Sequence, residues 1–493
     1  MNNKEKFGEI RTPSFCIDMM LEMLPNNVFK ESLTWLDPCA GDGRFYSRIQ
    51  EWIRAGKSSG VSHGESGGSM TSDGESGPAF YVIELNVEHS LALMDLQKTA
   101  TIPLHLFLCD FLSFHNPISF DIVIGNPPYN SNGLKKVPTN VNRKKTIDGI
   151  TIWPSFIRRS LFVLKDNGLL CMIVPSIWLK PDKAGIYDLM MQHKLVSLRC
   201  FSSSETKTIF KGEAQTPTCI FVLQKRDGGK GDEGSDEGGE GSDVGDEGGE
   251  EGDGNYISFR IHDDFTQSFF MYRHRIGRPI PMKYPSIVST FCKYVDVYGS
   301  VAPFIRKTNM PKKELLDNGI GVHLFRAVRS CVFIADGTPI LKSDTYFVPM
   351  PYQQEEKLIL AHKMYGLPYY DRHGIYGISN RDNYVLLKKD LGGEGATGSE
   401  GATGSEENIM IKYMHFLSSS IVLFLFDTTR YRMRYLEKYA FEFIPNIASY
   451  LTLDQLQDDS FLCRYFDLTP EVTSFILTRY PRYPKVFSPQ YVI

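Results

Sequence analysis

A proline-stiffened polar turn follows an apolar run near residue 125. The run Asp121–Ile124 is an expected strand, and Asn126, Pro127, Pro128 and Tyr129 come directly after it and a glycine. Two prolines fix the backbone, so the Asn126 side-chain oxygen and the Pro127 carbonyl can accept hydrogen bonds from one NH2 group. Two such acceptors would favour the pyramidal geometry that a planar amine needs as a nucleophile, with Tyr129 stacked on its ring. The turn therefore predicts chemistry on a planar amine or amide; the alternative is an ordinary Asn-Pro turn.

A second polar turn lies between an apolar segment and a helix. The sequence Leu36-Asp37-Pro38-Cys39-Ala40-Gly41-Asp42-Gly43 closes an expected strand and leads into a helix from Arg44. Its glycines let the backbone approach a ligand closely. The spacing matches neither the GxGxxG nor the GK[ST] pattern of phosphate-binding loops. An acidic turn of this kind suits a ligand that carries an amino group and a sulfonium charge.

Carboxylates also close the next two expected strands. Glu84 follows Tyr81–Ile83, and Asp110 with Phe111 follows Leu106–Leu108. Open α/β sheets bind ligands outside the carboxyl ends of their strands, and an acid after the second strand is the usual acceptor for a ribose diol. An acid followed by an aromatic residue suits the amine and the ring face of an adenine. Each acid alone reads equally well as a solvated strand end, but with the two turns they predict an adenosine-shaped pocket.

Short apolar runs alternate with helical patterns over the first 225 residues, which is typical of a mostly parallel sheet flanked by helices. The expected strands are Leu33–Leu36, Phe80–Ile83, Leu104–Leu108, Asp121–Ile124, Gly168–Val174 and Thr218–Leu223. Apolar residues at helical spacing predict helices over Pro13–Leu24 and Trp153–Leu164. After residue 255 the pattern loosens into mixed strands, turns and aromatic-rich stretches, which predicts a second domain.

The composition excludes several classes of protein. Of the 493 residues, 42% are hydrophobic and 23% are charged, so the chain can bury a substantial core and is not disordered throughout. No stretch approaches 18 uncharged apolar residues, and the N-terminus lacks the apolar run of a secretory signal, so we expect an intracellular protein without a membrane span. Nine cysteines without a CxxC pair predict free thiols, and eleven histidines without ligand spacing predict no metal site.

Three segments rich in Gly, Ser, Glu and Asp interrupt the patterned sequence. Residues 56–78, 227–254 and 392–408 carry net charges of −2, −11 and −4. Such tracts cannot bury enough apolar area to offset the entropy of ordering them, so we expect disordered surface inserts; the alternative is that they are functional acidic tails. Since the whole chain has a net charge of −4, the remainder has +13, which permits a polyanionic partner.

These motifs resemble the N6-adenine DNA methyltransferases of restriction-modification type, whose methyl donor is S-adenosylmethionine. The order of motifs is similar to the gamma class, including its Eco57I-like members: Gly8–Pro13 comes first, then the glycine turn, then the NPPY turn. The resemblance covers residues 8–225. It implies an α/β fold with a seven-stranded Rossmann-like methyltransferase sheet in a catalytic domain over 1–225. An acidic linker over 226–254 and a C-terminal mixed α/β target recognition domain over 255–493 would follow.

The resemblance also implies roles for single residues. The residues that would hold the donor are Thr12, Pro13, Asp37, Pro38, Cys39, Ala40, Gly41, Glu84, Asp110, Phe111 and Phe156. Thr12 would lie at the methionine end and Glu84 at the ribose hydroxyls. Phe210 would stack on the flipped base opposite Tyr129, with Phe201 as a rival and a core phenylalanine as the alternative. Asp42 departs from the family, which commonly has a small or hydroxyl residue at this position.

Specificity is expected from the C-terminal region, where basic and aromatic residues interleave. The clearest stretches are Met271–Arg278 and Arg430–Tyr435, whose arginines suit phosphates or guanine edges; a solvated or structural basic face is an equal alternative. Phe441–Asn446 and Leu468–Val472 resemble the closing segment of restriction-associated and viral adenine methylases.

The sequence thus predicts a site-specific DNA methyltransferase that transfers a methyl group to N6 of an adenine flipped out of duplex DNA. The alternatives are the same chemistry on an RNA adenine or a protein glutamine, and a DNA-binding relic without activity. No nuclease constellation is apparent, so cleavage would need a separate cognate endonuclease. We expect a monomer, because asymmetric targets need no two-fold symmetry.

Overall fold

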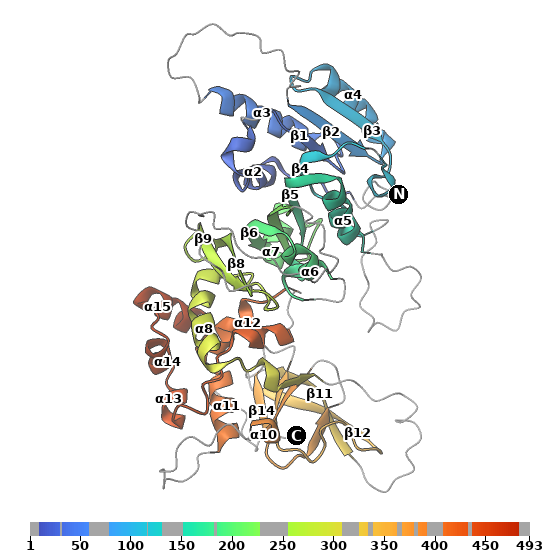
Figure 1. The fold of residues 1–493 in the computed structure, drawn as a ribbon. Helices are drawn as coiled ribbons and strands as arrows, with labels where there is room; N and C mark the ends of the chain where they lie inside the picture. The colour runs from blue at the N-terminus through green and yellow to red at the C-terminus, as the bar shows by residue number, and fades with distance from the viewer. Residues whose placement is uncertain are drawn as a thin grey trace, which may run out of the picture. The chain divides into compact units, whose positions relative to one another are not determined.

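The computed structural model contains the expected sheet (Figure 1). It describes residues 9–29, 32–58, 78–115, 117–130, 151–181, 185–226, 255–307, 325–333, 339–361, 367–378, 383–391, 408–431 and 436–482. The chain divides into two compact units: unit 1 is Met1–His262 with Gln267–Gly277, and unit 2 is Asp263–Thr266 with Arg278–Ile493. The predicted inserts lie outside the described residues, with three exceptions: residues 56–58 end a helix, residue 78 precedes a strand, and Asn408 caps the N-terminus of the helix Ile409–Leu417.

A nine-stranded sheet forms the middle of unit 1. Its spatial order is β3 (Leu104–Leu108), β2 (Ala79–Glu84), β1 (Thr34–Asp37), β4 (Phe120–Gly125), β5 (Leu164–Pro175), β7 (Thr218–Gln224), β6 (Lys194–Phe201), β8 (Tyr256–Asp263) and β9 (Ser268–Arg275). The strands from β3 to β5 are parallel, and β7 runs antiparallel to both of its neighbours. The sheet thus contains seven strands in Rossmann-like order, the number that the family resemblance implied, and β8 and β9 extend it.

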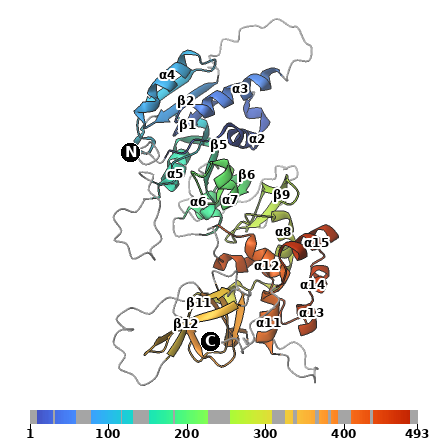
Figure 2. The same ribbon diagram turned by 180° about the vertical axis from the view of Figure 1, so that it is seen from behind.

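Helices cover both faces of this sheet. The helices of unit 1 are α2 (Ser14–Glu22), α3 (Arg44–Ser58), α4 (Ser90–Lys98), α5 (Trp153–Val163), α6 (Ile186–Met191) and α7 (Ser203–Ile209). Side chains of α2, α3, α4 and α7 share one core with β1, β2, β4, β5 and β7. The reverse view shows α5 on the opposite side of the sheet from α2 and α3 (Figure 2). Burial on both faces explains why β4 and β7 are continuous apolar runs.

Two parts of unit 1 differ from the sequence prediction. Strand β6 was not predicted, because Ser197 and Arg199 interrupt its apolar run. The hairpin of β8 and β9 was assigned to the second domain, but β8 pairs with β6 in parallel and so belongs to unit 1. The boundary between the compact units consequently follows Gly277 rather than residue 254. The short segment Asp263–Thr266, between β8 and β9, belongs to unit 2.

Unit 2 mixes two small sheets with helices. One sheet has the order β10 (Ile305–Lys307), β16 (Asn383–Leu387), β13 (Lys357–Ala361) and β14 (Pro368–Asp371); the other has β12 (Pro339–Tyr346), β11 (Phe325–Phe333) and β15 (Tyr376–Ile378). Its helices are α8 (Pro285–Tyr298), α10 (Lys388–Leu391), α11 (Ile409–Leu417), α12 (Ser420–Asp427), α13 (Leu453–Gln457), α14 (Asp459–Tyr465) and α15 (Pro470–Arg479). Unit 2 therefore contains both strands and helices.

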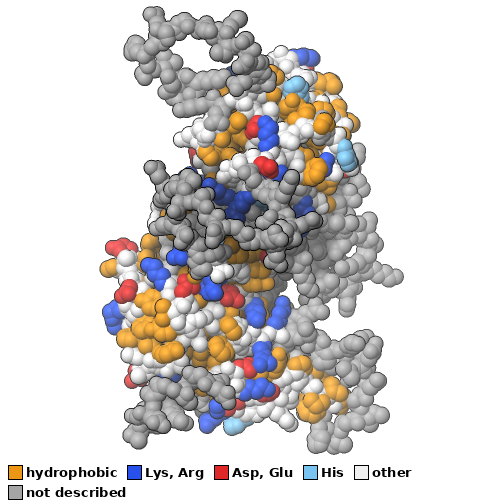
Figure 3. All heavy atoms as spheres, viewed as in Figure 1, with side chains coloured by type: hydrophobic (Ala, Val, Ile, Leu, Met, Phe, Trp, Pro, Cys, Tyr) orange, Lys and Arg blue, Asp and Glu red, His pale blue; other side chains and the backbone are white. Residues whose placement is uncertain are grey.

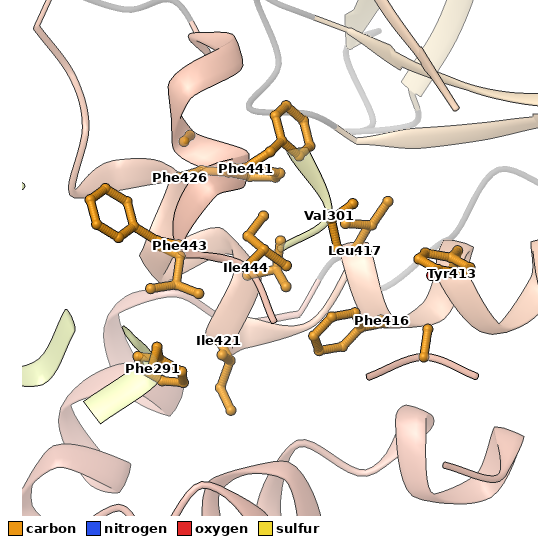
Figure 4. Close-up of a cluster of buried hydrophobic side chains, with 14 of the residues drawn as sticks. Phe291, Val301, Tyr413, Phe416, Leu417, Ile421, Phe426, Phe441, Phe443 and Ile444 are labelled. Atoms are coloured by element: carbon orange, nitrogen blue, oxygen red, sulfur yellow. The ribbon is translucent and has the colours of Figure 1, made fainter. Parts of the chain in front are cut away.

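Helices α11 and α12 supply much of the core of unit 2 (Figure 4). Phe416, Leu417 and Ile421 are fully buried and pack in one cluster with Phe291 of α8 and with Phe443. Within the described residues no single helix has the length and apolar character of a membrane span. Helices α11 and α12 satisfy that test only together, with a bend of 58° between them.

An exposed apolar strip marks the β3 edge of unit 1. Val87, Leu91 and Met94 repeat at helical spacing through the start of α4, and Leu108 ends β3; their exposed fractions are 67%, 73%, 42% and 43%. Orange side chains gather over this edge in the space-filling view (Figure 3).

Candidate active site

A cavity opens at the carboxyl ends of β1 to β4, where the polar turns predicted from the sequence meet. The predicted residues that line it are Thr12, Pro38, Cys39, Ala40, Gly41, Glu84, Asp110, Phe111, Asn126, Pro127, Pro128, Tyr129 and Phe156. These residues come from six separate stretches of the chain, and the parallel strands bring four of those stretches to one edge of the sheet.

Asp37, the last residue of β1, stabilises the turn that follows this strand. Asp37 is 1% exposed, and its Oδ1 accepts a hydrogen bond from the backbone N of Cys39 at 3.1 Å. Burial raises the pKa of Asp37 to about 8, so this carboxyl keeps its proton at neutral pH. Gly41 then adopts a φ of +54°, and a Cβ built on it meets no atom within 4 Å. The backbone at Gly41 therefore faces open space, as expected for a close approach to a ligand.

Glu84 joins this turn to the end of β2. Its Oε2 accepts from the backbone N of Gly41 and its Oε1 from the backbone N of Asn86, both at 2.6 Å. Burial raises the pKa of Glu84, although these backbone bonds counteract the effect. Each carboxylate oxygen retains a further lone pair, so Glu84 is fixed in place and can still accept from a ligand hydroxyl.

Two phenylalanines form an apolar wall of the cavity. Phe111 follows β3 and Phe156 lies in α5; their ring centroids are 5.6 Å apart and their planes are inclined by 34°. Beside them, Asp110 Oδ1 accepts from the backbone N of Leu112 and so caps the short turn that carries Phe111. The aromatic wall and the adjacent carboxylate suit a purine ring with an exocyclic amine.

The NPPY turn is oriented by the N-terminal segment. Asn126 Nδ2 donates to the carbonyl oxygen of Ile10 at 3.3 Å and to Thr12 Oγ1 at 3.1 Å. Because both of its amide hydrogens are engaged in this direction, the side-chain oxygen of Asn126 remains as the acceptor of the group. A Cβ at Gly125 would be tightly packed, because it would lie 3.1 Å from Asp37 Oδ1 and 3.2 Å from Pro38 Cδ. The two turns are thus packed directly against each other.

Tyr129 completes the turn at the wall of the cavity. Its carbonyl oxygen accepts from the backbone N of Ile152, just before α5. Its hydroxyl is buried and has no hydrogen-bond partner in the described part of the chain. Burial raises the pKa of this phenol well above its ordinary value, so Tyr129 is neutral and offers a ring face and one donor.

Three predicted site residues do not line the cavity. Pro13 precedes α2, and its carbonyl oxygen accepts from Cys16 N and Ile17 N. Asp37 lies beneath its turn, as described above. Phe210 is 3% exposed and packs in the core under α2 and α7, as does its rival Phe201. In this conformation Phe210 occupies a core position, which is the alternative considered for it, and a role on the base would require it to move.

The sequence analysis missed Glu9, a residue that lines the cavity, and its neighbour His89. Glu9 lines the cavity and its Oε1 lies 3.0 Å from His89 Nε2, while its Oε2 is buried without a partner in the described residues. In the sequence, only the position of Glu9 within the segment Gly8–Pro13 indicated that it could belong to the site. His89 lies in a short turn before α4 and gave no motif.

Other missed lining residues are near neighbours of predicted ones, namely Ile10, Arg11, Asp42, Arg44, Phe45, Leu85 and Cys109. Among them, Asp42 differs from the small or hydroxyl residue of the family. Both of its oxygens accept from Arg44 Nε, at 2.9 and 3.1 Å, which neutralises the added charge. Among the residues that the structure describes, no cluster of three or more His, Cys, Asp or Glu could hold a metal ion.

Residues 86–206 match the Eco57I restriction-modification methylase family. A curated relative, the type II methyltransferase M.TthHB8I of Thermus thermophilus, is 31% identical over 139 residues, which cover 25% of this chain. The matched part spans only 30% of that relative's length.

Two solved structures with similar folds are weaker matches. A class I S-adenosylmethionine-dependent methyltransferase of Listeria monocytogenes is 16% identical, with 44% of this chain and 61% of that chain covered and a TM-score of 0.31. The EcoKI M protein of a type I restriction enzyme is 19% identical, with coverages of 42% and 43% and a TM-score of 0.30.

S-adenosylmethionine is the cofactor that this family implies, and the residues of the cavity fit it. Gly41 faces open space, and Glu9 Oε2 is a buried acceptor for which the described protein supplies no donor. The aromatic wall of Phe111 and Phe156 lies beside Asp110. The match of residues 86–206 to the Eco57I restriction-modification methylase family agrees with the resemblance inferred from the motifs, and these residues lie in a unit whose sheet has Rossmann-like strand order.

Proposed function

We propose that the protein is an adenine-specific DNA methyltransferase, which transfers a methyl group from S-adenosylmethionine to N6 of an adenine flipped out of duplex DNA. The observation that carries this proposal is the orientation of Asn126. Its NH2 group is held by Ile10 and Thr12, which leaves Oδ1 to accept from the amine of a substrate. An N6 amine lies within the base pair and stack of a duplex, so the base must leave the helix to reach this oxygen.

The cavity residues divide into a donor part and an acceptor part. Glu84 would accept from the ribose hydroxyls of the donor, Phe111 and Phe156 would enclose its adenine, and Thr12 would lie toward its methionine end. The donor supplies an electrophilic methyl group attached to a sulfonium. After the methyl group is transferred, the rest of the donor is a neutral thioether. This leaving group therefore needs no acid to protonate it.

Asn126 and the Pro127 carbonyl would accept the two hydrogens of the substrate amine, with Tyr129 against the base. These contacts favour the pyramidal amine whose lone pair attacks the methyl carbon, so they are strongest in the transition state. The N–C bond forms as the C–S bond breaks, and one amine proton leaves to solvent. Unit 2 would recognise the target sequence.

The proposal is tested by supplying S-adenosylmethionine with a tritiated methyl group to duplex DNA, to RNA of matched sequence and to a protein extract. We expect label in DNA, and we expect Asn126→Ala to abolish the transfer while calorimetry shows that the variant still binds the donor. The Asn126→Ala variant controls for contaminating enzymes. Label confined to RNA or protein would contradict the DNA assignment. Donor binding without transfer to any acceptor would indicate an inactive relic.

A further inference from the structure

The hairpin of β8 and β9 presents an arginine face. Along β9 the residues alternate, so that Tyr272 and His274 are buried whereas Arg273 and Arg275 are exposed. In β8, Arg260 is exposed between two buried neighbours, Phe259 and Ile261. We call the exposed side chains Arg260, Arg273 and Arg275, together with the half-buried Tyr256 and Phe269, the arginine face.

Aromatic rings hold two of these arginines in place. The guanidinium carbon of Arg260 lies 5.1 Å from the ring centroid of Phe269, and that of Arg273 lies 4.3 Å from the ring centroid of Tyr256. Each contact crosses from one strand to the other, which shows that these side chains share one face of the hairpin. Stacking on a ring leaves the hydrogens at the edge of a guanidinium available for a ligand.

The opposite face anchors the hairpin. His274 Nε2 and the Tyr187 hydroxyl of α6 are 2.9 Å apart, and the same hydroxyl accepts from the backbone N of Gly277 at 2.9 Å. Phe259 and Tyr272 are each 1% exposed and pack edge to face. The arginine face is therefore carried by a fixed element, which lowers the entropic cost of binding a partner.

Within the described residues, no acid compensates the positive charge of the arginine face. Among the described residues no carboxylate forms an ion pair with Arg260, Arg273 or Arg275. Asp263, the one acid within these two strands, is fully buried and accepts from the backbone N of Phe265 and Thr266. Ion pairs within the described residues therefore do not account for these three arginines. The anionic groups of a polyanion could pair with them.

We infer that the arginine face binds the phosphate backbone of duplex DNA. This inference rests on the proposed function, because DNA is the substrate that brings a polyanion to this protein. Planar guanidinium groups match phosphate oxygens in two-point contacts, and contacts to phosphate fix a duplex in position without reading its sequence. The face therefore contributes to affinity and placement and leaves base recognition to other residues. Protection of the sheet edge by charge is the competing explanation for arginines on β9.

The test measures how DNA affinity depends on salt, using fluorescence anisotropy with a labelled duplex of about 40 base pairs of arbitrary sequence. The variant is Arg273→Gln/Arg275→Gln, and a matched control, Lys98→Gln/Arg464→Gln, removes two exposed positive charges elsewhere. Each lost phosphate contact reduces the slope of log K against log salt by about 0.9, so the hairpin variant should lose about 2 from its slope. We expect Arg273→Lys/Arg275→Lys to retain most of the slope.

The outcomes separate the inference from the proposed function. The inference holds if only the hairpin variant loses slope while its affinity for S-adenosylmethionine and its melting curve stay unchanged. It is overturned if the hairpin variant keeps the slope of the unchanged protein, or if the control loses as much. In those two cases the unchanged protein still methylates DNA, so the proposed function survives. A protein that neither binds nor methylates DNA would overturn both.

Discussion

At the scale of single residues, Asn126 depends on the segment that precedes α2. Thr12 Oγ1 and the Ile10 carbonyl hold its amide group, so these residues decide which way its oxygen points. A residue far away in the sequence thereby becomes part of the catalytic geometry. Thr12, implied as a donor contact, has in the structure this second task of orienting Asn126.

Thr12→Val should lower the transfer rate by about 10- to 100-fold, which corresponds to about 1.4–2.7 kcal/mol of barrier. Valine keeps the shape of threonine but offers no acceptor to the Asn126 amide, so the amide loses its fixed orientation. Single-turnover kinetics with saturating donor would measure the effect, and Thr12→Ser, which keeps the hydroxyl, should stay within about threefold of the unchanged protein. Equal losses in the two variants would refute the orienting role.

Asp37 should make the stability of the protein depend on pH. Its pKa is about 8 in the folded chain because of burial, and the unfolded chain has the ordinary value of 3.8. Between these values the folded state holds a proton that the unfolded state has released, so stability falls as pH rises, by at most about 1.4 kcal/mol per pH unit.

Asp37→Asn mimics the protonated side chain and should remove this contribution. Urea unfolding at several values between pH 4 and pH 8 would show the variant gaining stability relative to the unchanged protein as pH rises. If the difference in unfolding free energy between the two proteins does not change with pH, Asp37 is ionised in the folded state as it is in the unfolded state.

The residues of the site illustrate what the sequence could predict. Glu84, Asp110 and Asn126 each follow an apolar run, and the rule that parallel strands end at a common edge was enough to bring them together. The position of Phe210 in the core and the protonation of Asp37 could not be predicted, because both depend on which side chains lie across the sheet.

At the scale of elements, the strands of unit 1 were predicted wherever both faces are buried. β4 and β7 are such strands, and their runs of apolar residues are unmistakable. β6 was not predicted because it contains the polar residue Ser197. This residue is buried, and its hydroxyl donates a hydrogen bond to the carbonyl of Met23. The hairpin of β8 and β9 was misassigned because the acidic tract before it resembles a domain boundary.

In unit 2 a buried ion pair ties β13 to β14. Lys357 Nζ lies 2.7 Å from Asp371 Oδ2, and the two side chains are 0% and 2% exposed. Asp371 also accepts from the backbone N of Ile375 and Tyr376, so the carboxylate organises the turn that follows β14. Burial lowers the pKa of Lys357, and the attraction of Asp371 counteracts that shift.

Lys357→Met should destabilise unit 2 by about 3–5 kcal/mol, because it leaves the Asp371 charge buried and unpaired. Lys357→Met/Asp371→Asn should recover part of this loss, since the amide oxygen keeps an acceptor for the turn without a charge. Urea unfolding curves of the three proteins provide the comparison. A loss below about 1 kcal/mol in the single variant would mean that the pair contributes little to stability.

At the scale of the whole molecule, the proposed function is divided between unit 1, which would bind the donor, and the parts that would bind DNA. The average charge of −4 conceals this arrangement, since the acidic tracts outweigh a basic remainder. The arginine face belongs to unit 1, which also contains the cavity, so the proposed contacts with DNA are not confined to unit 2.

Methylation of adenine N6 in DNA can be measured by nucleoside mass spectrometry. Unmodified duplex DNA is incubated with the protein and S-adenosylmethionine, then digested to nucleosides, beside an Asn126→Ala control. We expect N6-methyldeoxyadenosine from the unchanged protein and none from the control. Methylated cytosine, or no methylated nucleoside from a protein that binds the donor, would contradict the proposed function.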